Sequence, residues 1–486
     1  MGKYFPKGEK MNLLGIDIGT TSLKAVLFDE TGKNLAGVNY DYTLSTVGDR
    51  VEFDPKEYIR IVKKAIGEIG EKYPIDAIAV DTQGETMILT DEKGEPTMPA
   101  IVWLDNRATK EADEIRAHFG QKTIYEVTGQ AETTGGWPAC KLVWVQRNLP
   151  EVWKKTRKVF LLEDWVLWAL SGEFVTEPTL QSSSIYLDIR TRAWWKEMLD
   201  FIGVPEEYLP KVVPSGTKIG SYGKAMVVTG ALDQIAGAIG VGVVDESAVS
   251  EMTGTIMAIC ATTDTIPPFD PKSVIPCHLH AVEGKYVRLL WSSTAGMALK
   301  WYRNTFAKDL SFRELDEEAA KVPAGSEGLT MLPYLTGSTM PVYNPDARGA
   351  FWGVTLAHTR GHFARAILEA VAFTLKDNLD CIHAKADQIR ITGGGATSPL
   401  WAQIKADVTG IRLATLEEKE SACLGTALLA GVGAGLFENV SDAAKKIVRT
   451  KKVYDPEGVD YSLPYKQYKK LDQLLNNVED KILCQK

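Results

Sequence analysis

The sequence lacks the long apolar run that a membrane-spanning helix needs. Such a helix takes about 20 predominantly apolar residues, whereas the longest candidate here, GTALLAGVGAGLF, is short and rich in glycine. The N-terminus, MGKYFPKGEK, is polar and basic, and Pro6 stands where a myristoylation signal has serine or threonine. We therefore expect no membrane partner and a cytoplasmic location.

Paired cysteines and blocks of basic residues are also missing. The six cysteines lie far apart with no C-x-x-C pair, so neither a zinc site nor a disulfide framework is indicated, and a reducing compartment fits best. The formal net charge is −8 and no cluster of Lys and Arg stands out. Because nucleic-acid-binding proteins carry a basic patch or stripe, no nucleic-acid partner is expected.

What the chain does have is length and an alternation of strand-like and helix-like segments. Its 486 residues exceed one hydrophobic core, since cores stop growing at roughly 250–300 residues. We place a domain boundary near Asp245, which gives an N-terminal domain 1–245 and a C-terminal domain 246–486. LLGIDIGTTSLKAVLF near the start is roughly echoed by SAVSEMTGTIMAICATTD, each with two apolar runs around a Gly-Thr turn. The alternation predicts an α/β fold.

Three turns rich in Gly or Thr follow predicted strands. They are Gly19-Thr20-Thr21-Ser22, Thr253-Gly254-Thr255 and Gly393-Gly394-Gly395. Backbone N–H groups in such turns can point at phosphate oxygens, and the hydroxyls add donors. Each turn alone is explained by ordinary turn chemistry, but three in one chain favour a nucleotide site. The chain has no Walker A motif and no G-x-G-x-x-G after its first strand, which excludes P-loop and Rossmann proteins.

Three charged residues beside these turns each allow two interpretations. Asp17 ends a predicted buried strand, where it either bonds its own turn amides or pairs with a cation such as magnesium. Asp233 begins a predicted helix, where it either caps free amides or aims into a cleft. Lys24, on the strand leaving the first turn, either reaches a phosphate or faces solvent.

A second group of polar residues follows two further apolar strands. Glu85 comes after AIAV, and Asp105-Asn106-Arg107 comes after AIVW. Open α/β sheets bind ligands at such strand ends, and these side chains can hydrogen-bond hydroxyls. The alternative is ordinary polarity of surface loops.

Taken together, these residues resemble the FGGY carbohydrate kinase family, in the actin, Hsp70 and sugar kinase superfamily. Five motifs appear in order between about Leu13 and Phe437: GIDIGTTSLKAVLFD, GETMILTDEKGEPTMPAIVWLDNRA, VVTGALDQIAGAIGVG, EMTGTI and ITGGGATSPLWAQIKADVTG. The resemblance implies two ribonuclease-H-like domains with a cleft between them. It also implies ATP-dependent phosphorylation of a sugar or polyol hydroxyl, and it allows a homodimer.

The resemblance also assigns roles to residues. It implies that Asp233 is the general base and that Asp17 holds Mg²⁺ through water. The ATP phosphates would be bound by Gly19, Thr20, Thr21, Lys24, Thr253, Gly254 and Thr255. The adenosine would be bound by Gly394, Gly395 and Ser398. The substrate would be bound by Gln83, Glu85, Trp103, Asp105, Arg107 and Asp233.

The substrate signals point to two subfamilies. AIVWLDNRA and GGGATSPLW look most like xylulokinases, which carry Gln-Met-His-Gly where this chain has Gln83-Gly84-Glu85-Thr86. Glycerol kinases carry Gln-Arg-Glu-Thr there, and EMTGTI also departs from the xylulokinase pattern Leu-Gly-Thr-Ser. We favour a small ketose, a pentulose such as xylulose. The alternatives are a glycerol- or erythritol-type polyol kinase, another sugar kinase of the same family, or a non-catalytic sugar sensor on the same fold.

Overall fold

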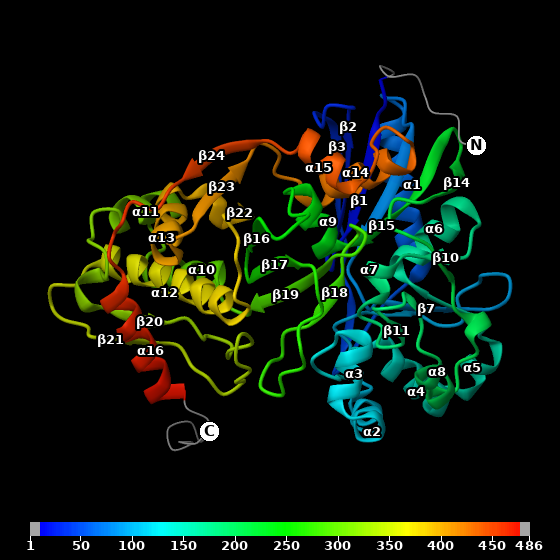
Figure 1. Ribbon diagram of the computed structural model, residues 1–486, viewed down its shortest axis with the longest axis horizontal. Coiled ribbons are helices and arrows are strands. Elements are labelled where there is room, and N and C mark those ends of the chain that lie inside the picture. Colours follow the sequence, from blue (N-terminus) through cyan, green and yellow to red (C-terminus); the bar gives the residue numbers. More distant parts are fainter. Residues whose placement is uncertain (1–9, 477–486) are drawn as a thin grey trace.

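The computed structural model describes residues 10–476 and builds two main sheets along the chain (Figure 1). Residues 1–9, which carry most of the N-terminal segment considered for targeting, lie outside the described residues. No helix within residues 10–476 combines the length and the apolar character needed to cross a membrane.

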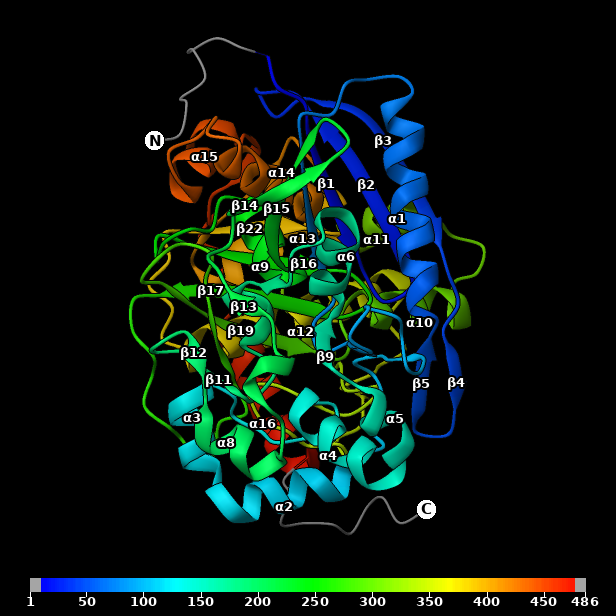
Figure 2. The same ribbon diagram turned by 90° about the vertical axis from the view of Figure 1, so that its right-hand side faces the viewer.

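The first sheet has six strands in the order β14-β15-β6-β1-β2-β3. They are β1 (Leu13–Ile18), β2 (Ser22–Phe28), β3 (Asn34–Asp41), β6 (Ala77–Thr82), β14 (Lys218–Tyr222) and β15 (Ala225–Leu232). The hairpin predicted near the N-terminus is confirmed, because β1 pairs antiparallel with β2, and β6 lies parallel to β1 on its other side. Leu14 and Ile16 pack with helices α1 (Pro55–Gly70) and α6 (Leu162–Ser171), whereas Leu13 enters a core on the opposite face. Figure 2 shows α1 running alongside β2 and β3.

The second sheet repeats this plan with seven strands in the order β18-β19-β17-β16-β22-β23-β24. They are β16 (Ala248–Thr253), β17 (Met257–Thr263), β18 (Cys277–Leu279), β19 (Tyr286–Ser292), β22 (Gln388–Thr392), β23 (Arg412–Leu416) and β24 (Thr450–Tyr454). Strand β16 pairs antiparallel with β17 and parallel with β22, as β1 does with β2 and β6. The internal repeat expected from the sequence is therefore present in the structure. Helices α10 (Gly296–Phe306), α12 (Arg360–Cys381) and α13 (Pro399–Thr409) share the core of this sheet.

Helix α14 (Ser421–Gly433) joins the two halves. It comes from the C-terminal half, yet it packs on β1, β6 and helix α9 (Asp233–Gly240). A Cβ on Gly425 would meet the carbonyl oxygen of Ala236 at 1.9 Å, so α9 and α14 touch backbone to backbone. A helix that follows Asp245 in the sequence thus packs on the first sheet. The domain boundary at Asp245 stays a prediction.

A smaller sheet that the sequence did not predict lies within the first half, in the order β4-β5-β8-β7-β9. Its strands are β4 (Ser45–Val47), β5 (Arg50–Phe53), β7 (Met87–Thr90), β8 (Ala100–Ile101) and β9 (Lys158–Leu161). It shares a core with α2 (Thr109–Phe119), α3 (Gln121–Thr128), α4 (Pro138–Asn148) and α8 (Lys196–Ile202). This sheet carries the polar loops after β6 and β8.

The remaining elements connect these layers. They are α5 (Pro150–Lys155), β10 (Val175–Thr176), α7 (Pro178–Gln181), β11 (Leu187–Asp188), β12 (Ala193–Trp194), β13 (Lys211–Val212), α11 (Phe312–Ala319), β20 (Thr330–Leu332), β21 (Ala350–Trp352), α15 (Val440–Ile447) and α16 (Ser462–Asn476).

Candidate active site

The first Gly-Thr turn joins β1 to β2 beside a neighbouring strand end. The Gly19 N–H donates to the Ser22 carbonyl at 3.0 Å, which closes the turn. Asp17 stands opposite Lys24 of β2 and opposite Asp81 of β6. Because β1 and β6 are parallel, their carboxyl ends meet at one edge of the sheet, where ligands bind in open α/β folds. Two aspartates therefore lie side by side at this edge.

Asp81 was not among the predicted site residues. It could have been found from the pattern that indicated Asp17, which is an aspartate near the end of an apolar strand. It is fully buried, and its Oδ2 accepts from the Thr426 hydroxyl of α14. Its Oδ1 has no hydrogen-bond partner. Burial raises the pKa of Asp17, and burial together with the charge of Asp17 raises the pKa of Asp81 well above its usual value.

Asp233 follows β15 directly and is the first residue of α9. Its Oδ1 accepts from the Gln234 N–H at 2.6 Å, one of the free amides of the first helical turn, although Leu232 and not Asp233 occupies the N-cap position. Burial raises the pKa of Asp233 to about 8, and the charges of Asp17 and Glu85 add to the rise. A carboxylate that titrates near neutrality is suited to accept a proton from a reacting hydroxyl.

The donors in this cluster fit a magnesium ion that arrives with a nucleotide. Within residues 10–476, no three His, Cys, Asp or Glu side chains are close enough to hold a metal ion by themselves. Magnesium, however, binds through one or two carboxylates together with substrate phosphates and water. The unpartnered Oδ1 of Asp81 and the raised pKa of Asp17 mark carboxylates whose ionised forms lack a sufficient counter-charge.

The loop after β6 carries Glu85, and a buried lysine stands behind it. Glu85 has φ +58°, a backbone conformation that non-glycine residues adopt mainly at functional or strained positions. The Lys141 Nζ donates to the Glu85 carbonyl at 3.3 Å and to the Val102 carbonyl at 3.0 Å. Burial lowers the pKa of Lys141 to about 8, although the charges of Glu85 and Asp105 oppose this. Sequence reasoning missed Lys141, because it sits in the apolar stretch PACKLVWV, which is typical of a core helix.

Trp103 connects the loops after β6 and β8 to the first Gly-Thr turn. Its indole Nε1 donates to the Thr20 hydroxyl at 3.0 Å, and its backbone N–H donates to the Thr86 hydroxyl at 3.2 Å. The side chain remains 39% exposed. Gln83 is nearly buried, and its Nε2 donates to the Tyr58 hydroxyl at 3.3 Å.

Asp105 and Arg107 are occupied by contacts within the protein. Arg107 bonds to both oxygens of the fully buried Asp105 and pairs with Glu52 at 2.6 Å. Asp105 also accepts from the Val51 N–H at 2.7 Å. These contacts favour a role in shaping the loop, and direct substrate contact by this pair stays a prediction.

Lys24 is engaged in an ion pair, so neither of the two interpretations offered for it describes it fully. Its Nζ pairs at 2.5 Å with Glu420, the residue that precedes α14. Both side chains are partly exposed, so the pair is accessible to a competing anion. The phosphate contact expected for Lys24 would require this pair to exchange partners.

The second Gly-Thr turn is supported by a buried ion pair. The Thr253 hydroxyl, at the end of β16, donates to Glu251 and accepts from the Lys405 Nζ at 2.7 Å. Glu251 and Lys405 pair at 2.8 Å, with side chains 0% and 1% exposed. The Gly254 N–H donates to the Ile256 carbonyl at 2.9 Å and closes the turn. Thr255 is exposed, so its hydroxyl is free for a ligand.

The Gly-rich turn after β22 packs against this second motif. A Cβ on Gly395 would meet the Thr253 Cβ at 2.6 Å, which shows how closely the two turns approach. The Ser398 hydroxyl accepts from the Trp401 N–H at 3.0 Å and caps α13. A Cβ on Gly394 would meet no atom within 4 Å, so that residue has open space beside it. The structure thus joins the expected second phosphate and adenosine motifs, with the Thr253 and Ser398 hydroxyls already bonded.

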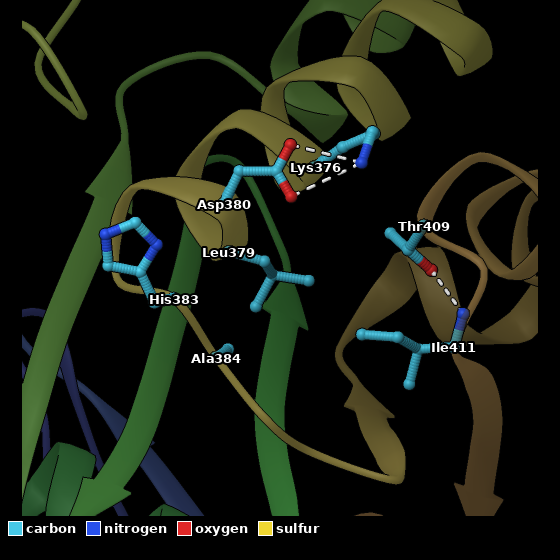
Figure 3. A pocket seen from close by; sticks show the side chains of 7 residues that line it. All are labelled: Lys376, Leu379, Asp380, His383, Ala384, Thr409 and Ile411. Atoms are coloured by element: carbon cyan, nitrogen blue, oxygen red, sulfur yellow. Dashed lines mark hydrogen bonds and ion pairs between the residues drawn. The ribbon is translucent and has the colours of Figure 1, made fainter. Parts of the chain in front are cut away.

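A pocket in the second half contains none of these residues (Figure 3). Of its polar side chains, Lys376 pairs with Asp380 at 3.1 Å and the Thr409 hydroxyl accepts from the Ile411 N–H at 3.3 Å. It contributes nothing to the predicted site.

Two repeated sheets, each with a Gly-Thr turn beside a parallel strand, define the two-domain α/β class of the actin, Hsp70 and sugar kinase superfamily. Residues 12–246 match the N-terminal domain of the FGGY family of carbohydrate kinases, and residues 277–434 match its C-terminal domain. The chain belongs to the FGGY family of carbohydrate kinases, which confirms the family and fold class predicted from the sequence. It is therefore a phosphotransferase that uses ATP as donor and an alcohol group as acceptor.

Curated relatives and solved structures agree with this assignment. A xylulose kinase from Lactococcus lactis subsp. lactis is 30% identical over 462 residues, covering 90% of this chain and 91% of that protein. A gluconokinase from Bacillus subtilis is 29% identical over 501 residues, covering 96% of each. The crystal structure of a ligand-bound xylulose kinase from Lactobacillus acidophilus aligns with a TM-score of 0.88 at 28% identity, covering 96% of this chain and 99% of that one.

Proposed function

We propose that this protein transfers the γ-phosphoryl group of ATP to a hydroxyl of a small ketose, a pentulose such as xylulose, with Asp233 as the general base. The observation that carries this proposal is the position of Asp233, a half-buried carboxylate at the start of α9 whose pKa is raised by burial and by the nearby charges of Asp17 and Glu85. Asp233 would accept the proton of the acceptor hydroxyl while that oxygen attacks the γ-phosphorus in line. The proton ends on a carboxylate whose pKa is already raised towards neutrality.

The first Gly-Thr turn would bind the outer phosphates from one sheet, and Thr255 with the Gly254 turn would bind them from the other. A magnesium ion held by Asp17 and Asp81 would neutralise the charge that spreads over the phosphoryl oxygens. Gly394 would border the adenosine, because it is the residue of its turn with open space. In this arrangement the protein mainly positions ATP and the hydroxyl and keeps water away.

The charges around the acceptor favour a neutral sugar over a sugar acid. Glu85, Asp233 and Asp17 are all carboxylates, and Lys141 is fully buried with its Nζ donating to two carbonyls. A gluconate carboxylate would meet like charge here, which costs affinity. We therefore prefer the reaction of the xylulose kinase relatives to that of the gluconokinase relatives. The alternative is a polyol such as glycerol or erythritol, which the Gln-x-Glu-Thr segment at Glu85 supports.

A coupled assay of ADP release across a substrate panel tests this proposal. The panel contains D-xylulose, L-xylulose, D-ribulose, L-ribulose, glycerol, erythritol and gluconate, each with ATP and Mg²⁺. We expect the highest kcat/KM with a pentulose and the lowest with gluconate. A polyol as the best acceptor would replace the ketose assignment, and no turnover with any acceptor would favour a non-catalytic sugar sensor.

A cytoplasmic location and a homodimer remain parts of this proposal. Light scattering coupled to size-exclusion chromatography distinguishes a dimer from the 53.4 kDa monomer.

A further inference from the structure

Strand β15 contains a β-bulge just before Asp233. The register between β15 and β6 shifts here, so Thr229 and Gly230 together oppose a single residue of β6, Val80. A Cβ on Gly230 would meet the Val80 carbonyl oxygen at 1.9 Å, so this position requires glycine. Bulges bend the strand that carries them and re-aim the side chains that follow. The direction of Asp233 therefore depends on how this bulge is held.

Two buried side chains from other elements accept hydrogen bonds from backbone N–H groups of the bulged segment. Glu163, near the start of α6, accepts from the Gly230 N–H at 2.8 Å. Thr179, in α7, accepts through its hydroxyl from the Leu232 N–H at 2.9 Å. Both side chains are fully buried. These amides would otherwise be buried without partners, which is unfavourable.

The Thr179 hydroxyl is itself oriented. It donates to the Glu177 Oε1 at 2.8 Å, and the Glu177 Oε2 accepts from the Ser215 hydroxyl at 2.6 Å. A hydroxyl has a single proton, so the bond to Glu177 leaves only its lone pairs for the Leu232 amide. The backbone of Leu232, the residue directly before Asp233, is thus held by a buried network of Thr179, Glu177 and Ser215.

We propose that Glu163 and Thr179 are positioning residues that hold the bulge of β15 and thereby aim Asp233 at the acceptor hydroxyl. This inference rests on the proposed function of Asp233 as the base. Glu163 bonds to the backbone three residues before Asp233 and Thr179 to the backbone one residue before it, and neither lies in a motif predicted to touch ATP or sugar. Loss of either hydrogen bond would shift the Asp233 carboxylate without removing a contact to ATP or sugar. The effect therefore falls on kcat, because small errors in the alignment of reacting groups slow the chemical step.

A matched pair of substitutions at Thr179 tests the proposal. T179V keeps the shape but removes the acceptor, whereas T179S keeps the hydroxyl and removes a methyl group. We expect T179V to lower kcat about 10- to 100-fold while the KM values for ATP and sugar change less than about threefold. We expect T179S to retain kcat within about threefold. Wild-type kcat in T179V, equal losses in the two variants, or KM values that rise in step with the loss of kcat would each overturn the proposal.

A second pair at Glu163 separates the acceptor from the charge. E163Q retains an oxygen that can accept from the Gly230 N–H, whereas E163M does not. We expect kcat to fall in E163M and to recover most of its wild-type value in E163Q. Equal loss in both variants would show that the charge matters and not the held amide, which contradicts the proposal.

Hydrogen–deuterium exchange of the peptide covering 229–233 supplies a readout that needs no substrate. The amides of this peptide should exchange faster in T179V than in the wild type and at the wild-type rate in T179S. If the wild type phosphorylates no acceptor, the proposed function fails while this measurement still tests the support of the bulge. Unchanged exchange in T179V would overturn the positioning role by itself.

Discussion

The two Gly-Thr hairpins of this protein share a backbone plan and differ in how their buried charges are balanced. Behind β16–β17, Glu251 is neutralised by Lys405 at 2.8 Å within the fold. Behind β1–β2, Asp17 and Asp81 lie side by side, and Lys24, which faces Asp17 across the hairpin, is paired with Glu420. The second hairpin is thus balanced by a cation of the fold, whereas the carboxyl groups of Asp17 and Asp81 are not paired with a cationic side chain among the described residues, which is where we propose that magnesium binds. Under the proposed function, the first hairpin would hold the metal ion, and the second would bind the phosphates from a turn whose buried charges are already balanced.

Neutralising the first hairpin should have the largest effect. D17N removes a carboxylate from the sheet edge where we propose that magnesium binds, and we expect kcat to fall by about 10²–10³, the range seen when one group that stabilises transition-state charge is lost. Unfolding temperature should not fall, because the raised pKa of Asp17 shows that its ionised form is unfavourable there. The ADP-release assay and a thermal melt measure the two quantities.

The matched control is D29N at the far end of the same hairpin. Asp29 bonds only to its own turn, accepting from the Thr31 and Lys33 amides. The kcat of D29N should stay at the wild-type value. A D17N enzyme as active as D29N would refute the contrast between the hairpins.

Breaking the charge pair of the second hairpin should act on stability. K405M leaves Glu251 buried without a cation, which we expect to destabilise the protein by about 3–5 kcal/mol. The double variant E251Q/K405M removes both charges and should recover most of this loss. Urea unfolding gives the free energies. If K405M unfolds like the wild type, or if the double variant is less stable than K405M, then the pair does not balance charge as described.

Removing the buried lysine should have a smaller effect that is confined to the sugar. K141M loses the donors to the Glu85 and Val102 carbonyls, and we expect kcat/KM for the sugar to fall about 10- to 100-fold. The KM for ATP should change less than about twofold, because no nucleotide motif contacts Lys141. Steady-state kinetics with each substrate varied in turn separates the two. K154M, at a lysine whose side chain is 70% exposed, is the control and should match the wild type.

The pH dependence should be the mildest effect. A base with a pKa of about 8 is mostly protonated at lower pH, so kcat/KM for the sugar at low ATP should rise with pH and level off above about 8. With saturating Mg²⁺ and ATP, this rise of the rate with pH should shift to lower pH, because a nearby cation favours the ionised carboxylate of Asp233. A shift of this rise to higher pH would contradict the proposal that magnesium binds close to Asp233.

The sequence predicted what local pattern can encode. The turn after Asp17, its echo at Thr253 and the aspartate at 233 each follow an apolar strand, and the structure places all three at strand ends. Glu251 and Lys405 are 154 residues apart, so no local pattern shows that they pair. Lys141 was missed because its neighbours in sequence are apolar and predict a core helix. Only the structure shows that its Nζ donates to the Glu85 and Val102 carbonyls. The small sheet was missed because its strands have only two to four residues, too short for an alternating pattern.

The most direct test of the account is the rate of sugar-dependent ADP release by D233N at saturating ATP and acceptor. The substitution keeps the size of the side chain and an oxygen that can accept from the Gln234 N–H, but an amide cannot serve as the base. The account predicts that turnover falls by at least about 10²-fold, while ATP binding measured by calorimetry stays within about threefold of the wild type. Turnover close to the wild-type rate would show that Asp233 is not the base and would contradict the central claim.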